Sequence, residues 1–88
     1  MRLISQDGEI DVPYEHGSLC IGFIKGEEHI ISTISYYNYS SQKGTKLAEY
    51  SSKSKVLKVM EMVRNAYSRF TNTYNIIFKF PADEEVEV

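Results

Sequence analysis

Residues 52–70 read SKSKVLKVMEMVRNAYSRF, and their apolar side chains recur at spacings of three and four. This spacing places them along one stripe of an α-helix. The stripe consists of Val56, Val59, Met60, Val63, Ala66, Tyr67 and Phe70. We therefore predict one amphipathic helix from about Ser52 to about Phe70, with Ser51 or Ser52 as its N-cap.

The chain before this helix is predicted to form two β-hairpins. Residues 3–5 and 10–12 flank an Asp7-Gly8 pair, which supplies the positive φ that a tight hairpin turn needs. Residues 18–25 and 29–37 alternate between two faces and are rich in β-branched residues. A short polar connection joins these two longer runs, so we expect them to pair antiparallel.

Two shorter strands complete the predicted sheet. Residues 47–50 should form a short strand that leads into the helix, and residues 74–80 a last strand that Pro81 ends. The predicted fold class is α+β, a small antiparallel sheet of two hairpins plus short strands covered by one amphipathic helix, in the order β-β-β-β-β-α-β. Residues 1–82 would form a single domain. Residues 83–88 would form an acidic C-terminal tail that extends the sheet or trails in solvent.

Length and composition limit the function classes. The 88 residues have room for one core, and 42% hydrophobic with 25% charged residues is ordinary globular usage. No apolar run approaches the roughly 18–20 residues that span a bilayer, and the N-terminus turns polar too soon for a signal peptide, so we expect a cytoplasmic protein with no membrane partner. Since a domain this small buries a modest share of its surface, we also expect a homo-oligomer.

The single cysteine, Cys20, cannot form an internal disulfide. Its neighbours Leu19 and Ile21 are apolar, and free cysteine usually behaves as a small buried hydrophobe. We therefore expect Cys20 to pack in the core.

The net charge of −2 conceals a segregation of charge. Basic residues dominate residues 51–80, where Glu61 is the single acid. In residues 83–88 every charged residue is acidic. Such asymmetry suggests that the tail packs against the helix or that the charges form a contact surface. A run of carboxylates can also imitate a phosphate backbone, although a solubilising terminus is the simpler interpretation. The candidate partner-binding residues are Lys53, Lys55, Lys58, Arg64, Asp83, Glu84, Glu85 and Glu87.

The sequence has no recognisable catalytic or metal-binding constellation. His16, His29 and Cys20 lack the spacing of metal ligands, and no serine stands in a Gly-x-Ser-x-Gly turn. Two acid pairs fall at the predicted hairpin tips, where solvated carboxylates are usual; they are Asp7/Glu9 and Glu27/Glu28. We therefore predict a protein that is not an enzyme and that uses no cofactor and no metal.

One stretch indicates a ligand site. Tyr36, Tyr37 and Tyr39 are followed by Lys43 and Lys46. Aromatic faces beside amino groups are what nucleobases and phosphates need. We take these residues as the candidate ligand-binding set; the alternative is that the tyrosines cover the sheet edge and core with their hydroxyls reaching water.

Three blocks of the sequence carry a resemblance to a known family. They are MRLISQDGEIDVPYE at 1–15, AEYS through KVMEMVRNAY at 48–67, and FKFPADEEVEV at 78–88. In these blocks the chain resembles a family of short uncharacterised proteins of Clostridia-type bacteria, their prophages and mobile elements. Members of that family have acidic residues at the helix start, where this chain has Ser52, Lys53 and Ser54. The resemblance implies a small accessory factor carried by a phage, and it brings no site residues.

The leading hypothesis is a non-enzymatic phage or mobile-element accessory protein that inhibits by binding. Its partner would be a bacterial defence protein, or a cyclic nucleotide whose signal it sequesters. The alternative is a small nucleic-acid-associated regulatory protein that uses the basic helix face, and such phosphate contacts weaken steeply with salt. A third possibility, a small hydrolase, would depend on Cys20 or His16.

Overall fold

The computed structural model describes residues 1–41, 43–69 and 76–88. The elements, in chain order, are β1 (Arg2–Ile4), β2 (Asp11–Pro13), the 3-10 turn η1 (Tyr14–His16), β3 (Gly17–Lys25), β4 (Ile30–Asn38), β5 (Gly44–Tyr50), α1 (Lys53–Ser68), β6 (Ile77–Lys79) and the 3-10 turn η2 (Asp83–Glu85). This order confirms the predicted α+β class and the succession β-β-β-β-β-α-β.

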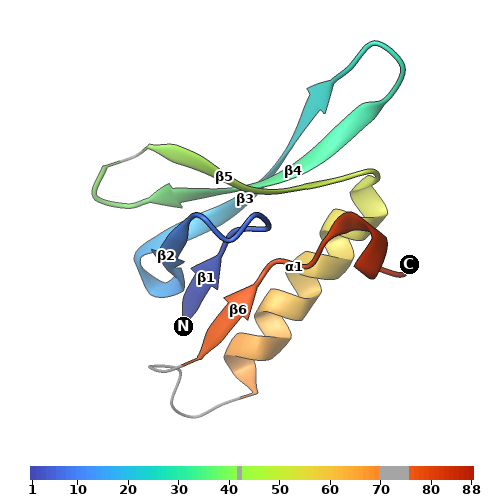
Figure 1. The fold of residues 1–88 in the computed structure, drawn as a ribbon. Coiled ribbons are helices and arrows are strands. Elements are labelled where there is room, and N and C mark those ends of the chain that lie inside the picture. Colours follow the sequence, from blue (N-terminus) through green and yellow to red (C-terminus); the bar gives the residue numbers. More distant parts are fainter. Residues whose placement is uncertain (42, 70–75) are drawn as a thin grey trace.

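The strands form two three-stranded sheets instead of one (Figure 1). One sheet has the order β2-β1-β6 and the other the order β3-β4-β5. β6 runs parallel to β1, whereas the other described pairs are antiparallel. A parallel pair needs a crossover connection, and the segment that contains α1 supplies it. Alternation in the sequence identifies a strand but not its neighbour, so the expected single antiparallel sheet was wrong on this point.

The first hairpin follows its sequence signal. Gly8 in the turn has φ 78°, a conformation that glycine adopts readily. The Asp7 carboxylate accepts hydrogen bonds from the Ser5 hydroxyl at 2.5 Å and from the Glu9 amide at 3.0 Å. These bonds favour the ionised form, so they lower the pKa of Asp7. Pro13 ends β2, which is an edge strand, where proline's missing N–H leaves no ladder bond unmade.

β5 begins at Gly44, earlier than the predicted short strand, and contains a bulge. Ile34 pairs with Ala48, but Ser35 pairs with Lys46, so Leu47 is the extra residue. The bulge lets two consecutive side chains, Leu47 and Ala48, both lie in the core.

α1 confirms the predicted helix and its cap. The Ser52 hydroxyl accepts a hydrogen bond from the Lys55 amide at 3.3 Å. Val56, Val59 and Val63 are buried. The predicted helix residue Phe70 and the first residues of the predicted last strand, 74–75, lie outside the described residues.

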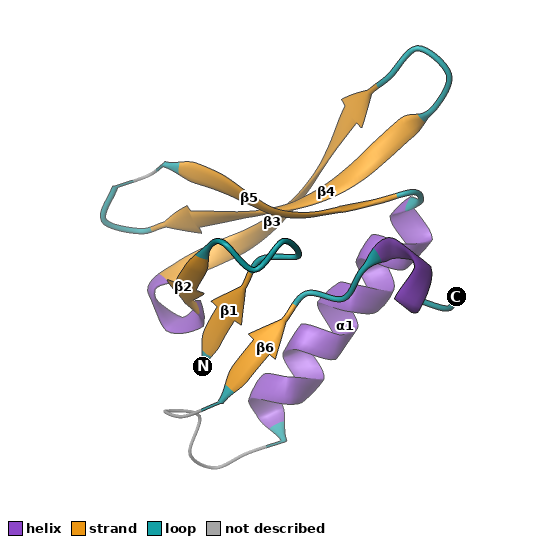
Figure 2. Cartoon of the chain, viewed as in Figure 1, coloured by secondary structure: helices purple, strands orange, loops and turns teal. Residues whose placement is uncertain are grey.

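The core forms where α1 packs against both sheets (Figure 2). Leu3 of the first sheet, Ile34 of the second and Phe80 after β6 belong to the same buried cluster as the three helix valines. The two sheets therefore share one core.

Gln6, in the β1–β2 turn, ties the two sheets together. Its backbone N–H donates to the Leu47 carbonyl at 2.8 Å. Its side-chain amide donates to the carbonyls of Glu49 at 3.1 Å and Pro81 at 3.0 Å, and its side-chain oxygen accepts from the Glu49 N–H at 2.9 Å. One side chain thus fixes the first hairpin against β5 and against the segment after β6.

Residues 83–86 neither extend the sheet nor trail in solvent, whereas Glu87 and Val88 are exposed. Asp83–Glu85 form η2, and Val86 is buried. The Asp83 carboxylate accepts from the Ser51 amide at 2.7 Å, and the Lys55 ammonium donates to the Asp83 carbonyl at 2.8 Å. Hydrogen bonds from Ser51 and Lys55 lower the pKa of Asp83. These contacts of Asp83 confirm the first interpretation of the charge segregation, that the acidic end packs against the helix start.

Cys20 is exposed, contrary to the expected core position. It pairs with Ser35 across the sheet, whereas its neighbours Leu19 and Ile21 pair with the buried Tyr36 and Ile34. Successive strand residues point to opposite faces, so apolar neighbours place Cys20 on the face away from the core. Within the described residues, no helix combines the length and the apolar character needed to cross a membrane.

Candidate functional site

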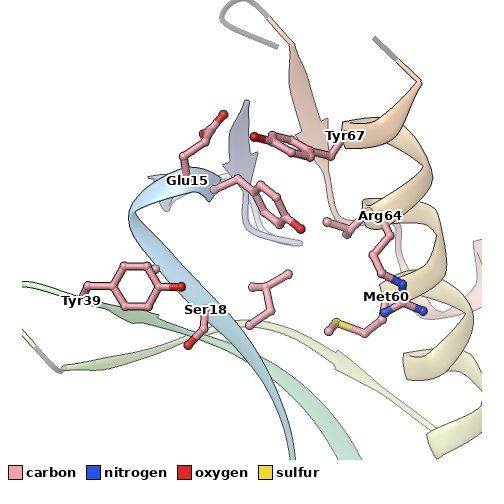
Figure 3. Close-up of a pocket in the computed structure, with 10 residues that line it drawn as sticks. Glu15, Ser18, Tyr39, Met60, Arg64 and Tyr67 are labelled. Carbon is pink, nitrogen blue, oxygen red and sulfur yellow. The ribbon is translucent and has the colours of Figure 1, made fainter. Parts of the chain in front are cut away.

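An open cleft of about 440 Å³ lies between the start of β3 and the C-terminal half of α1 (Figure 3). Its volume falls within the roughly 300–1,000 Å³ that is usual for small-molecule sites. The turn η1 and the residue that follows β4 contribute the remaining walls. The lining residues include Tyr14, Glu15, Tyr39, Met60, Arg64 and Tyr67.

Three tyrosines from distant parts of the chain line this cleft. The rings of Tyr14 and Tyr67 are in contact, with centroids 4.8 Å apart and planes tilted by 48°. Tyr39 is 67% exposed and comes from the β4 side of the cleft, apart from Tyr67 on α1 (Figure 3). Exposed aromatic faces around a cavity of this size are suited to stacking on a planar ring.

Arg64 supplies a cation to the same cleft. It lies four residues after Met60 and three before Tyr67, so the three side chains share one face of α1. No carboxylate of the described residues lies within ion-pair distance of Arg64. The nearby acid Glu15 is paired with the N-terminal ammonium at 2.6 Å, which offsets its charge. The planar guanidinium can bind a phosphate or carboxylate with two parallel hydrogen bonds.

The predicted tyrosine cluster is not assembled as one surface. Tyr36 is buried, its hydroxyl donates to the Pro13 carbonyl at 2.6 Å, and burial raises its pKa. Tyr37 lies on the opposite face of β4, where its ring covers Gly44 so closely that a Cβ there would approach it to 2.6 Å. Tyr36 has no ring face left for a ligand, and of the predicted set Tyr39 alone lines the cleft.

The two lysines of that set lie away from the cleft. Lys43 is exposed and directly precedes β5, and Lys46 forms an ion pair with Glu49. Neither residue lines the cavity. The cation that lines the cleft is the Arg64 guanidinium and not the amino group of either lysine.

Acidic residues of the same chain partly neutralise the basic helix face. Lys55 is bound to Asp83, and Lys58 lies 3.9 Å from Glu61. Lys53 is exposed at the start of α1 and lines a second, more apolar groove. The remaining acids of the predicted partner-binding set, Glu84, Glu85 and Glu87, are exposed.

Sequence reasoning missed most of the cleft. Tyr67 was assigned to the apolar stripe of the helix, and Tyr14 and Glu15 were noted only as part of a resemblance block. The unusual number of tyrosines, seven, was the one available signal. It could not indicate which of them converge, because that depends on how the first hairpin packs on α1.

In the part of the chain that the structure describes, no three His, Cys, Asp or Glu side chains gather as a metal site. Comparisons with models of protein families, with curated proteins and with solved structures found no match.

Proposed function

We propose that this chain is a non-enzymatic binding protein that sequesters a nucleotide signal in the cleft between β3 and α1. The observation that supports the proposal is the convergence of Tyr14, Tyr39 and Tyr67 with Arg64 around one cavity. A nucleotide combines a planar base with an anionic phosphate, and this cavity offers aromatic faces beside a cation.

The base would stack on the tyrosines. Stacking on an aromatic side chain is worth about 1–3 kcal/mol per base and tolerates every base, because each has a π-face. Tyr39 is the most exposed of the three, so its ring can reorient over a ligand without disturbing the core. Tyr14 and Tyr67 already contact each other and would form the fixed wall.

The phosphate would bind Arg64. A hydrogen bond to a charged group contributes about 1.5–3 kcal/mol, more than a neutral one. Because Glu15 is already paired with an ammonium, its carboxylate would repel the phosphate less than an isolated carboxylate would.

Capture by itself would make such a protein an inhibitor. A protein that binds a signalling nucleotide lowers the free concentration by mass action and breaks no bond. With the resemblance to short proteins of prophages and mobile elements, the proposal is that the chain blocks a bacterial defence component by withdrawing its signal.

The alternative of a nucleic-acid-associated regulator has less support. Its proposed contacts include Lys55 and Lys58, which are close to Asp83 and Glu61. The acidic turn η2 also lies against the helix start, where it would repel a phosphate backbone.

Isothermal titration calorimetry with AMP, adenosine, cyclic AMP and cyclic di-AMP tests the cleft. We expect binding of at least one nucleotide, weakened roughly 10–100-fold in Arg64→Gln because a charge-assisted hydrogen bond is lost. Arg69→Gln, at the exposed end of the same helix and outside the cleft, is the matched control and should bind normally. Tyr39→Ala should weaken binding roughly 5–100-fold through lost stacking, whereas Tyr37→Ala should not.

The ligand recovered after denaturation should be chemically unchanged. Turnover would refute the non-enzymatic proposal. The absence of binding to all four probes, or binding that Arg64→Gln and Tyr39→Ala leave intact, would refute the assignment of the cleft. Affinity for nucleic acid that falls steeply with salt and depends on Lys53 would support the alternative instead.

A further inference from the structure

The outer edge of β3 is unpaired in the described structure. β3 is nine residues long and is the first strand in the order β3-β4-β5. Besides β4, it packs mainly on η1. A strand of this length with one free edge presents a row of backbone donors and acceptors to the solvent.

The register fixes which residues point outward. The Tyr39 amide donates to the His16 carbonyl at 3.0 Å, and the Gly26 amide donates to the His29 carbonyl at 2.9 Å. Hydrogen-bonded and non-hydrogen-bonded pairs alternate along an antiparallel ladder. The even-numbered residues of β3 therefore bond to β4, and the odd-numbered ones direct their N–H and C=O groups to the free edge. These outward residues are Gly17, Leu19, Ile21, Phe23 and Lys25.

This edge lacks the features that usually protect one. Natural edge strands are short, charged or interrupted by proline. Here Lys25 at the far end is the one charged residue of the strand, and β3 has no proline. Phe23 is 72% exposed and Ile21 40%. They also line an apolar groove of about 480 Å³ with Ile30, so apolar surface adjoins the free backbone edge.

We propose that β3 pairs antiparallel with β3 of a second copy of the chain, across a two-fold axis at Ile21. Such an interface uses the same surface on both copies. The two β3-β4-β5 sheets would then form one continuous sheet with both helices on the same face.

The strand is self-complementary in this register. Leu19 lies opposite Phe23 of the partner subunit, and Ile21 lies opposite the partner subunit's Ile21. Lys25 lies opposite Gly17 of the partner subunit, so the two lysines do not meet. The pairs Leu19–Phe23 and Ile21–Ile21 each join two apolar side chains, and such cross-strand pairs stabilise a sheet. The outward backbone groups of one copy meet the outward groups of the other, as the alternation requires.

The pairing also reaches the candidate cleft. Leu19 is one of the cleft walls. Phe23 of the partner subunit would lie beside it on the same face, so each copy would contribute an apolar side chain next to the cleft of the other.

Engineered cysteines test the register directly. In a Cys20→Ser background, Ser18→Cys and Ile24→Cys would face each other across the two strands, as a non-hydrogen-bonded pair with Cα atoms about 4.5 Å apart. That separation permits a disulfide, whereas the same two positions within one chain are about 20 Å apart. We expect a disulfide-linked dimer on a non-reducing gel. Cys20→Ser with Ser18→Cys alone is the control and should stay unlinked.

Sedimentation of the nucleotide-free protein tests the dimer independently of the proposed function. We expect a dimer that Phe23→Glu weakens at least about tenfold, as the loss of about 1.4 kcal/mol of association free energy would do. Ile77→Glu, at a residue that is 67% exposed on β6, is the matched control and should leave the dimer intact. Circular dichroism should show both variants folded, because both side chains are exposed.

Three outcomes would overturn the proposal: a monomer at every accessible concentration, a dimer indifferent to Phe23→Glu, or a dimer in which the engineered cysteines at positions 18 and 24 stay unlinked. The last would mean that the strands meet in another register or face to face. None of these outcomes bears on nucleotide binding, which the cleft variants test separately.

Discussion

Replacing Gln6 should reveal how strongly one side chain holds the two sheets together. Its amide makes three hydrogen bonds to backbone groups of Glu49 and Pro81, at 2.9–3.1 Å. In Gln6→Ala these three backbone groups lose their partner. Each hydrogen bond contributes about 0.5–1.5 kcal/mol. Because water can reach the half-buried site and partly replace these bonds, we expect the free energy of unfolding to fall by about 2–3 kcal/mol.

Gln6→Glu should be less stable than Gln6→Ala at neutral pH. The carboxylate can still accept from the Glu49 N–H, but it cannot donate, and it turns negative charge toward the carbonyls of Glu49 and Pro81. Those carbonyls favour the protonated acid, so the folded-state pKa of the introduced glutamate should be raised. The variant should therefore gain stability relative to Gln6→Ala as the pH falls through that raised value.

Thermal and urea denaturation of the two variants, from pH 4 to pH 8, measure both effects. For a domain of this size, a loss of 2–3 kcal/mol corresponds to a fall in Tm of about 10–20 °C. A loss of unfolding free energy below about 0.5 kcal/mol in Gln6→Ala would show instead that water replaces all three hydrogen bonds without cost. The difference in unfolding free energy between Gln6→Ala and Gln6→Glu should change with pH. A difference that stays constant from pH 4 to pH 8 would contradict the expected raised pKa of the introduced glutamate.

Two further predictions concern packing and pH. Gly17→Ala should cost about 1–3 kcal/mol in urea denaturation, because the added Cβ would lie 2.5 Å from the Tyr36 ring. Gly22→Ala, whose Cβ would meet only the Thr33 hydroxyl at 3.1 Å, should cost less, and equal losses would contradict this account. The Asp83 carboxylate has a pKa below its ordinary 3.8, so the stability it contributes is present above pH 3.8 and is lost as the pH falls through the lowered value. Asp83→Asn should lower stability at pH 7 and flatten the acid limb of the urea midpoint measured against pH, and an unchanged acid limb would argue against this role.

The alternation of side chains along a strand could predict one feature of the candidate site but not the others. Tyr36 and Tyr37 are adjacent in a strand, so the two-residue period already implied opposite faces, and grouping them in one site ignored that signal. The convergence of Tyr14, Tyr39 and Tyr67 had no such signal. Their proximity depends on packing between segments that are far apart along the chain.

The local elements of this protein follow from interactions between residues that are close together along the chain. The helix stripe and the Ser52 cap act between residues a few positions apart, and the Asp7-Gly8 turn depends on the φ that glycine permits. Packing between distant segments, by contrast, sets the parallel pairing of β6 with β1, the position of Cys20 on the face away from the core, and the packing of η2 on the start of α1. These outcomes depend on which apolar faces bury one another, and many pairings of the same strands satisfy the same alternation until the core is packed.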